Sequence, residues 1–482
     1  MVLEDLFDTI DYQTLGDFQN IKIKGIQFDS KKCQKDDLFI AIKGNSADGH
    51  AFIPHAVAQK VRVVVCQKWP EEVSSEVLYV KVVCTREALG IMAHNFYGKP
   101  SNELNLIGIT GTNGKTSVST LLYHLYESSG QKSGLISTIE IRNHDQVLKS
   151  TLTTPNPLNI NYHLRKMVDL GVEQCFMEVS SHGIEQKRIK GLNFAGGVFT
   201  NLSHDHLDYH LTYKNYRDTK KSFFDALDSE AFALTNKDDS HGDFMLQNTI
   251  SKTYSYGIYS NADYQGKVIE RQLDGYLLEI EGIDFWSQLV GDFNLYNVLA
   301  TYATALILGY PKQKLHRDLS QLKPIDGRFQ TIETKRGTII IDYAHSPNAL
   351  KNVLDAINRL KNKNQKIITI IGCGGNRDSS KRPLMGHIAV QNSHYVIFTS
   401  DNPRNESPQL IIEQMLQGIK EKKDRQKVLA EVDRRLAIVK AYELATAEDI
   451  VLIAGKGHEK FQEINQTQIV FDDVAIAKEI FN

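Results

Sequence analysis

The stretch Gly108–Ser117 (GITGTNGKTS) limits the possible folds of this chain more than any other feature of its sequence. It closes an apolar segment, Leu104–Thr110, that predicts a buried strand. It precedes a predicted helix whose apolar residues recur at i, i+3, i+4 and i+7, namely Val118, Leu121, Leu122 and Leu125. A strand, a glycine loop and an amphipathic helix in this order indicate a phosphate-binding loop, because backbone amides at a helix N-terminus bind anions.

Two side chains at the start of this helix add the chemistry of nucleotide binding. Lys115 is placed to reach the β- and γ-phosphates, and Thr116 to hold Mg²⁺. The loop is not a strict GxxxxGK(S/T) motif, because Ile109 stands at the first glycine position. A glycine-rich turn without a ligand is the alternative, but the strand, the loop, the Lys-Thr pair and the helix together predict ATP binding.

The last third of the chain alternates between predicted strands and helices. The strands lie near 338–342, 366–371, 395–399 and 449–454. The helix after the first strand begins at Ser346-Pro347, an N-cap followed by proline at N1. This alternation predicts a Rossmann-like doubly wound sheet, which binds ligands beyond the carboxyl ends of its strands. Polar clusters stand at those ends: 344–348 (AHSPN), 372–382 (GCGGNRDSSKR), 400–408 (SDNPRNESP) and 455–459 (GKGHE).

The length of 482 residues predicts about three domains, at roughly 100–200 residues per domain. Turn-rich sequences at Tyr97–Asn102 (YGKPSN) and Pro324–Arg328 (PIDGR) are the candidate boundaries. We therefore expect an α/β protein with domains at 1–101, 102–328 and 329–482. The first is a small α/β module, the second places the phosphate loop on a central parallel sheet of the P-loop ATPase type, and the third is the Rossmann-like sheet.

Composition argues against several classes of protein. Lys and Arg total 56 against 58 Asp and Glu, and the formal charge of −2 does not suit a protein that coats nucleic acid. Apolar stretches are of strand length and none approaches the ~20 residues that span a bilayer. Acids in Met1–Ile10 stand where a signal peptide carries basic residues, so we expect no export signal. Five scattered cysteines without CxxC spacing indicate reduced thiols in the cytoplasm.

Motifs between about residues 28 and 463 resemble those of the Mur ligases of peptidoglycan synthesis. The motifs are GTNGKTS (111–117), TTPNP (153–157), MEVSSHGIEQKRI (177–189), FTNLSHDHLDYH (199–210), GDFNLYN (291–297), DYAHSPNAL (342–350), GCGGNRD (372–378) and DNPR (401–404). Their order along nearly the whole chain argues against chance similarity. Within the family they are most similar to the branch that adds the third amino acid, usually meso-diaminopimelate, to UDP-N-acetylmuramoyl-L-Ala-D-Glu.

The resemblance implies an ATP-dependent, ADP-forming ligase whose three domains bind the UDP-sugar, ATP and the amino acid in chain order. ATP would convert the D-Glu side-chain carboxylate into an acyl phosphate, which the amine of the amino acid attacks. The implied cofactors are ATP and Mg²⁺. The implied partners are the UDP-muramoyl dipeptide and meso-diaminopimelate, with no nucleic acid and no membrane insertion. We expect a cytoplasmic monomer that serves cell wall biogenesis and, through it, cell shape and cell division.

Site residues carry over from the family motifs position by position. ATP binding is implied for Gly111, Thr112, Asn113, Gly114, Lys115, Thr116, Ser117, Asn297, Arg328, Asp342 and His345. Binding of the UDP-muramoyl substrate is implied for Ser30, Thr153, Thr154, Ser181, Gln186 and Arg188. Binding of the amino acid is implied for Arg377, Asp401, Asn402, Pro403, Arg404, Gly455 and Glu459. The implied catalytic residues are Lys115, Glu178, His206 and Lys220, and the implied magnesium environment comprises Thr116, Glu178, His206 and Lys220.

The segment 204–210 (HDHLDYH) holds three histidines and two aspartates, and taken alone it suggests a zinc site. Catalytic zinc needs three converging ligands and an open position, and crowding does not show convergence. In isolation a surface loop is therefore favoured. Magnesium prefers oxygen ligands, so the family's assignment of His206 to magnesium is weaker than those of Glu178 and Thr116.

Lys220 lies in a helix predicted over 213–227. It stands on the aromatic face of that helix, which comprises Tyr213, Tyr216, Phe223, Phe224 and Leu227. Lys221 adjoins Arg217, Asp218 and Asp225, and we expect it to be solvated. In the resembling family the lysine at the position of Lys220 is carbamylated, and its new carboxylate assists Mg²⁺.

We expect Arg404 to determine which amino acid the enzyme accepts. Diaminopimelate differs from lysine by a distal carboxylate, and a desolvated carboxylate needs a cationic partner. Arginine can bind it bidentately, and DNPR resembles the diaminopimelate-adding enzymes, whereas lysine-adding relatives tend to lack this arginine. Asp401, Arg377 and Glu459 would supply further partners for a zwitterionic end.

Other functions remain open on the sequence alone. A lysine-adding ligase of the same family and a folylpolyglutamate-type ligase share the phosphate loop and general plan, although the folate enzymes have no obvious need for the first domain or for DNPR. A nucleotide-dependent switch without ligase chemistry is the alternative from another class. VSSH (179–182) does not indicate a serine nucleophile, because adjacent strand residues point to opposite faces and no G-x-S-x-G elbow is present.

Overall fold

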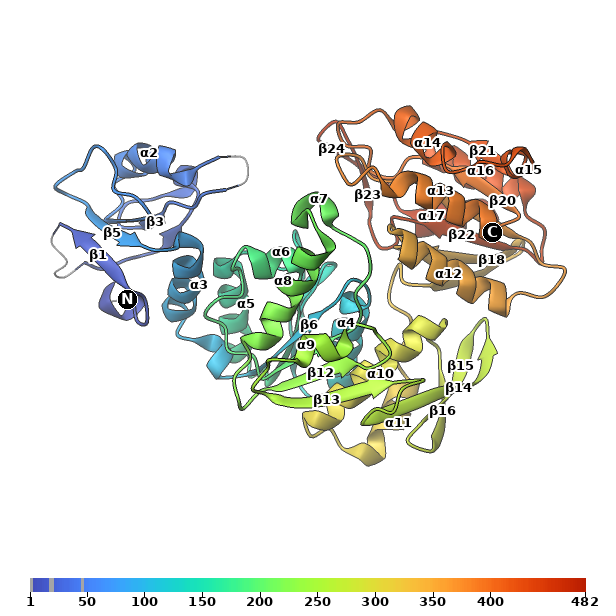
Figure 1. The fold of residues 1–482 in the computed structure, drawn as a ribbon, viewed down its shortest axis with the longest axis horizontal. Coiled ribbons are helices and arrows are strands. Elements are labelled where there is room, and N and C mark those ends of the chain that lie inside the picture. Colours follow the sequence, from blue (N-terminus) through green and yellow to red (C-terminus); the bar gives the residue numbers. More distant parts are fainter. Residues whose placement is uncertain (1–2, 17–20, 45–46) are drawn as a thin grey trace.

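The computed structural model describes residues 3–16, 21–44 and 47–482. Its helices and strands form three sheet-bearing units that follow one another along the chain (Figure 1). The expected α/β class with three sheet-bearing domains is therefore confirmed. Within these described residues, no helix is both long and apolar enough to cross a membrane.

The first unit is a five-stranded sheet with flanking helices, at one end of the molecule in Figure 1. Its strands pair in the order β1-β5-β4-β3-β2, and β1 alone runs antiparallel to its neighbour. Helix α3 packs against α5 of the next unit and so joins the two. The elements are α1 (Leu3–Leu6), β1 (Tyr12–Leu15), β2 (Ile26–Gln27), η1 (Ser30–Lys32), β3 (Leu38–Ile40), η2 (Gly49–Phe52), α2 (Ile53–Ala58), β4 (Val63–Cys66), β5 (Leu78–Val82), α3 (Thr85–Phe96) and η3 (Pro100–Asn102).

The central unit contains an eleven-stranded sheet, of which β13-β12-β11-β6-β10-β7 form the parallel core. Hairpins extend it, β8 and β9 at one edge and β14 to β16 at the other. The elements are β6 (Asn105–Thr110), α4 (Lys115–Ser128), β7 (Ser133–Ile136), β8 (Glu140–Asn143), β9 (Gln146–Lys149), α5 (Pro157–Asp169), β10 (Gln174–Glu178), α6 (Ser181–Glu185), β11 (Gly196–Phe199), α7 (Leu207–His210), α8 (Tyr213–Asp225), β12 (Phe232–Asn236), α9 (Gly242–Leu246), β13 (Lys252–Gly257), β14 (Tyr264–Gln272), β15 (Gly275–Ile280), β16 (Ile283–Ser287), α10 (Asp292–Ile307) and α11 (Lys312–Ser320).

Alternation along β6 explains why this sheet is covered on both faces. Ile107 and Ile109 join the core beneath α4 and α10, whereas Leu106 joins the core beneath α5 and α8. A strand buried on both faces reads as a continuous apolar run, as the sequence predicts for 104–110. The phosphate loop therefore leaves an interior strand of the parallel core, with β10 and β11 on either side.

The last unit is the predicted doubly wound sheet, in the order β17-β18-β22-β19-β20-β21, with β17 antiparallel. Helices α12, α13 and α14 cover one face, and α16 and α17 cover the other. The elements are β17 (Gln330–Thr334), β18 (Gly337–Asp342), α12 (Pro347–Leu360), β19 (Ile367–Ile371), α13 (Lys381–Asn392), β20 (Tyr395–Phe398), α14 (Pro408–Leu416), α15 (Lys422–Arg425), β21 (Val428–Ala430), α16 (Arg434–Leu444), β22 (Ile450–Ala454), β23 (Phe461–Ile464), β24 (Thr467–Val470) and α17 (Asp473–Phe481).

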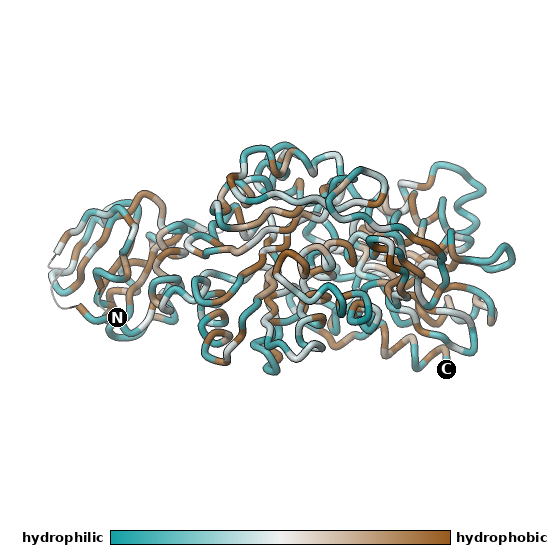
Figure 2. The backbone as a smooth tube through the Cα atoms, turned by 90° about the horizontal axis from the view of Figure 1, so that it is seen from below, coloured by the Kyte–Doolittle hydropathy of each residue, from teal (hydrophilic) through white to brown (hydrophobic). Residues whose placement is uncertain are grey.

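The termini of these strands position the site. Ser346 caps α12 as predicted, with its side chain accepting a hydrogen bond from the Ala349 amide. The loops after β18, β19, β20 and β22 leave the same edge of the sheet, because these strands are parallel. Figure 2 shows hydrophobic stretches of the chain in the interior and hydrophilic stretches around them.

Candidate functional site

The loop between β6 and α4 depends on its glycines. Gly111 and Gly114 have positive φ angles of 151° and 87°. A Cβ atom on Gly111 would lie 1.9 Å from Thr200 Oγ1, and one on Gly114 would lie 2.6 Å from Asn297 Oδ1. Asn201, just after β11, accepts two hydrogen bonds from the loop. Its carbonyl oxygen accepts from the Thr112 amide at 2.8 Å, and its Oδ1 accepts from the Asn113 amide at 3.0 Å. These contacts leave no room for side chains at the two glycines and hold the loop against the sheet.

Lys115 folds over this loop. Its Nζ donates to the carbonyl oxygens of Gly111 and Thr112, both at 2.9 Å. Burial lowers the pKa of Lys115, while the carboxylates of Glu178 and Asp205 act in the opposite direction. The lysine is thus held mainly by the loop's own carbonyl groups, which a bound phosphate can replace.

A cavity of about 370 Å³ brings three groups of implied residues together. The phosphate loop and Glu178, His206 and Lys220 line one side of it. The implied substrate residues Thr153, Thr154, Ser181 and Arg188 also line it, as do Arg377, Asp401, Asn402, Arg404, Gly455 and Glu459 of the last unit. Ser30 lies in the first unit, on η1, and is not part of this lining.

Glu178 is fully buried at the carboxyl end of β10, beside the phosphate loop. Its carboxylate accepts hydrogen bonds from the Thr138 amide at 2.7 Å and the Thr138 hydroxyl at 3.1 Å. Asp205 and the hydroxyl of Thr116 add further hard oxygens to the cavity. No group of three or more His, Cys, Asp or Glu side chains among the described residues converges as metal ligands. This sparse oxygen set fits Mg²⁺, which takes one or two carboxylates and retains waters.

Lys220 is buried on α8, with 1% of its surface exposed. Its Nζ donates to the Gly111 carbonyl at 2.8 Å and lies 4.9 Å from the centroid of the Tyr216 ring. Burial lowers the pKa of Lys220 well below its usual value, and the nearby charge of Lys115 lowers it further. Burial therefore disfavours the charged form of the Lys220 amine relative to the uncharged form, which is the nucleophilic one.

The expectation that Lys221 is solvated is wrong. Lys221 is only 6% exposed, and it forms an ion pair with Asp225. Its Nζ lies 5.7 Å from the centroid of the Phe244 ring on α9. Helix α9 packs against α8 and covers a face that the helix pattern alone presents as polar.

The histidine-rich segment after β11 folds back over α6. His206 has a φ angle of 55°, and its ring lies 5.1 Å from that of His182. His182 also stacks near Tyr209 and His210, at 4.1 and 5.7 Å between ring centroids. Burial lowers the pKa of His206 to about 3 and that of His182 to about 4. These rings are therefore neutral near pH 7.

The expected strand geometry of VSSH is wrong, because none of its four residues lies in a strand. Strand β10 ends at Glu178, and Ser180 caps the short helix α6 through a hydrogen bond from the Gly183 amide. Ser181 is therefore helical, and its Oγ lies 2.9 Å from Nε2 of His210, not of His182. The pattern of alternating strand faces does not apply here, because the chain turns at the serine pair.

Four of the residues implied to hold the UDP-muramoyl substrate form one hydrogen-bonded group beside Glu178: Thr153, Thr154, Gln186 and Arg188. Arg188 donates to the Thr154 carbonyl at 2.6 Å and twice to Gln186 Oε1, at 3.1 and 2.7 Å. The Thr154 hydroxyl donates to the Glu178 carbonyl at 2.8 Å. The Thr153 hydroxyl lies 3.0 Å from the Thr138 hydroxyl and accepts a hydrogen bond from it. Thr138 thus contacts both Thr153 and the Glu178 carboxylate.

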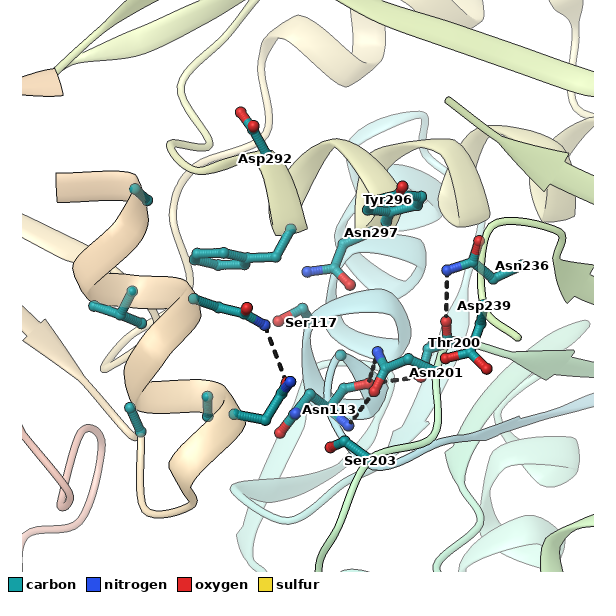
Figure 3. A pocket seen from close by; sticks show the side chains of 18 of the residues that line it. Asn113, Ser117, Thr200, Asn201, Ser203, Asn236, Asp239, Asp292, Tyr296 and Asn297 are labelled. Carbon is teal, nitrogen blue, oxygen red and sulfur yellow. Dashed lines mark hydrogen bonds between the residues drawn. The ribbon is translucent and has the colours of Figure 1, made fainter. Parts of the chain in front are cut away.

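A second cavity, of about 410 Å³, lies between α10 and α12 and includes part of the phosphate loop (Figure 3). The implied nucleotide residues Asn113, Gly114, Ser117, Asn297, Arg328, Asp342 and His345 all line it. In Figure 3, the side chain of Asn297 extends from α10 toward Ser117. The cavity thus extends from the phosphate loop between α10 and α12.

Sequence reasoning missed the wall of this cavity that follows β12. Asn236, Asp238 and Asp239 line it together with Tyr296. Asp238 accepts the Tyr296 hydroxyl at 2.9 Å and three amides of the loop 258–260. The signal was present, because these polar residues (NKDD) end a parallel strand at the same edge as the phosphate loop.

The last unit reaches the phosphate loop through the residues at the domain boundary. Arg328 donates to the Thr116 hydroxyl at 3.3 Å, and its guanidinium lies 4.6 Å from the centroid of the Tyr343 ring. Its buried Nε has no hydrogen-bond partner, which suits an anionic ligand. Burial raises the pKa of Asp342 to about 6, and burial lowers that of His345 to about 4.

The loops after β19 and β20 form the wall that carries the implied amino-acid residues. The Gly375 amide donates to the Asn402 carbonyl at 2.9 Å, and a Cβ on Gly375 would lie 1.9 Å from the Pro403 carbonyl oxygen. Arg404 donates to the Gly375 carbonyl at 2.8 Å, and its Nε lies 3.1 Å from Glu463. A guanidinium has five N–H donors, so Arg404 keeps free donors at the cavity.

Comparisons with known proteins agree with this arrangement. Three family models match the chain: "Mur ligase family, catalytic domain" at residues 22–97, "Mur ligase middle domain" at 109–305 and "Mur ligase, glutamate ligase domain" at 327–457. UDP-N-acetylmuramoyl-L-alanyl-D-glutamate–2,6-diaminopimelate ligase of Cytophaga hutchinsonii is 47% identical, over 100% of this chain and 99% of its own.

Solved structures are similar over the same length. A structure of a UDP-N-acetylmuramoyl-L-alanyl-D-glutamate–2,6-diaminopimelate ligase is 32% identical with a TM-score of 0.66, and covers 97% of this chain and 96% of its own. A MurF ligase of Thermotoga maritima in complex with ADP is 19% identical with a TM-score of 0.64, and covers 96% and 98%. The second likeness concerns the fold alone.

Proposed function

Because the chain belongs to the Mur ligase family, we propose that it joins meso-diaminopimelate to UDP-N-acetylmuramoyl-L-Ala-D-Glu with hydrolysis of ATP to ADP. The observation that carries the proposal is one cavity lined by three sets of residues. These are the phosphate loop, the implied substrate residues (Thr153, Thr154, Ser181 and Arg188), and a wall of mixed charges from the last unit (Arg377, Asp401, Asn402, Arg404 and Glu459). Relatives of full length that share nearly half of the sequence carry this activity in their names, which favours it over lysine addition and over folate polyglutamylation. A nucleotide-dependent switch without ligase chemistry would not need the wall of mixed charges.

The reaction begins at the D-Glu side-chain carboxylate, which attacks the γ-phosphorus of ATP and becomes an acyl phosphate as ADP leaves. Lys115 and Arg328 would neutralise the transferring phosphate, since both cations meet at the phosphate loop. The amine of the amino acid then attacks the acyl carbon, and phosphate leaves from a tetrahedral intermediate. No protein nucleophile is required, because binding holds the three reactants in position.

Magnesium would be held by Thr116, Glu178 and a carbamylated Lys220, with His206 nearby. When bound, the ion would neutralise phosphate oxygens. The amide and the hydroxyl of Thr138 both donate to the Glu178 carboxylate and so orient it at the cavity. Adenine would lie against Asn297 and Tyr296 in the second cavity.

Each domain would bind one of the three substrates, in the order of the chain. We propose domains at 1–101 for the UDP-sugar, 102–328 for ATP and 329–482 for the amino acid. Ser30 would then reach the UDP moiety from the first domain, which explains why it lies outside the catalytic cavity. We place the enzyme in the cytoplasm as a monomer, in peptidoglycan precursor synthesis and hence in cell shape and division. Five free cysteines are consistent with a reducing compartment.

Phosphate release tests whether the chain is a ligase. With ATP and Mg²⁺, we expect release to rise at least about a hundredfold when both the UDP-muramoyl dipeptide and meso-diaminopimelate are present, because the acyl phosphate forms and turns over only with both. Each substrate alone serves as the control. Basal hydrolysis that is indifferent to both substrates would favour a nucleotide switch instead.

A further inference from the structure

We propose that Lys456 is a positioning residue that fixes the carboxylate of Glu459 to receive the distal ammonium group of the amino-acid substrate. The proposal rests on the proposed ligase function and extends it to a residue outside the family motifs quoted above. Lys456 lies in the loop after β22, and its side chain is completely buried. A buried lysine is costly unless its charge is paired, so its partners indicate its role.

Both hydrogen-bond partners of Lys456 Nζ belong to the wall of mixed charges. The ammonium donates to Asn402 Oδ1 at 3.0 Å and to Glu459 Oε2 at 3.0 Å. Asn402 in turn donates to the same Glu459 oxygen at 2.8 Å. The three side chains form a closed triangle, with two donors on one carboxylate oxygen. This triangle fixes the direction of the Glu459 carboxylate.

The rest of the Glu459 carboxylate remains available to a ligand. The Glu459 side chain is 19% exposed and lines the cavity, whereas Lys456 does not line it. Its other oxygen, Oε1, has a weak contact with the Tyr343 hydroxyl at 3.4 Å. A carboxylate accepts about four hydrogen bonds, so Oε1 can accept an ammonium from the cavity. Lys456 thus supports the carboxylate from behind while the ligand approaches from the front.

The ligand group concerned is the distal ammonium. The reacting amine must lie at the phosphate loop, where the acyl phosphate forms. Glu459 and Arg404 lie on the loops of the last unit, so they face the other end of the amino acid. That end of diaminopimelate carries one carboxylate and one ammonium. Arg404 has free donors for the carboxylate, and Glu459 has free acceptor capacity for the ammonium.

Two substrates and two variants of Lys456 test this assignment. L-2-Aminopimelate has the chain and both carboxylates of diaminopimelate but lacks the distal amine. We expect the wild type to use it at least about tenfold less well, in kcat/KM, than meso-diaminopimelate. Lys456→Met removes the charge and the hydrogen bonds, and Lys456→Gln keeps a donor without the charge. In both variants, KM for meso-diaminopimelate should rise at least about tenfold, KM for ATP should change less than about twofold, and the preference for the second amine should disappear.

The matched control is Lys460→Met, in the same loop. Lys460 is 54% exposed and pairs with Asp472 at 2.8 Å, so this variant should behave as wild type. On a Glu459→Gln background, Lys456→Met should cause no further loss of preference, because Lys456 acts through Glu459.

Folded Lys456 variants that keep the wild-type KM and substrate preference would overturn the inference. If neither variant folds, Glu459→Gln alone must lose the preference for the second amine, and retention of that preference overturns the inference equally. Failure of the wild type to couple meso-diaminopimelate at all is a different result, since it overturns the proposed function first.

Discussion

Lys115→Ala is expected to abolish ATP turnover in a folded protein, with a loss of about a thousandfold or more in kcat. The phosphate loop supplies backbone amides, but they cannot offset the charge that develops on the β- and γ-phosphates. Lys115 is the cation of that loop, and its Nζ lies on the loop carbonyls of Gly111 and Thr112. Steady-state phosphate release with all three substrates measures the loss.

The fold should survive this substitution, because the Lys115 head group is bonded to the loop itself and not to the surrounding core. Thermal unfolding and binding of the UDP-muramoyl dipeptide should therefore remain close to wild type. Lys132→Ala is the matched control, since Lys132 is exposed beyond the other end of α4. Near-normal coupling by a folded Lys115→Ala variant would refute the assignment of the phosphate loop.

Lys220→Ala is expected to lose activity at least about a hundredfold and to regain part of it when formate or acetate is added. Burial lowers the pKa of the Lys220 amine and so favours its uncharged form, which is the form that adds CO₂ to give a carbamate and a proton. The positive charge of Lys115 nearby would stabilise the resulting carboxylate. A short carboxylate that diffuses into the cavity left by the substitution replaces the lost oxygens.

The control for this experiment is Lys214→Ala. Lys214 lies on the same helix, is 75% exposed and pairs with Asp218, so its loss should leave the rate unchanged. Lys221 is not a suitable control, because it is buried against α9. An intact mass of the active enzyme that shows unmodified Lys220, or activity of Lys220→Ala that no short acid alters, would exclude carbamylation.

The architecture was predictable where one local pattern decided it. Alternating strands and helices predicted the doubly wound sheet, and the apolar run at 104–110 predicted the buried strand β6 to within one residue. The edge hairpins β8 to β9 and β14 to β16 carry no such pattern, because strands such as β9 and β14 are largely exposed and mix polar with apolar residues. The packing of one element on another could not be predicted from such patterns either. The burial of Lys221 beneath α9 was therefore not predicted.

The candidate site divides in the same way. Residues that belong to a motif, such as Lys115 and Arg404, line one cavity, where the strand order brings the loops that carry them together. Asp238 and Lys456 carry no catalytic motif, and they matter through contacts between loops that lie far apart in the chain. Such contacts follow from tertiary packing, which spacing along one segment does not encode.

The choice of amino acid is the central claim, and a coupling assay with labelled meso-diaminopimelate and labelled lysine in one reaction tests it most directly. We expect the wild type to form the diaminopimelate tripeptide almost exclusively, because the free donors of Arg404 pair with the distal carboxylate. Arg404→Ala should lower kcat/KM for meso-diaminopimelate at least about a hundredfold without creating good use of lysine. Preferential incorporation of lysine by the wild type, or full diaminopimelate activity in Arg404→Ala, would contradict the account.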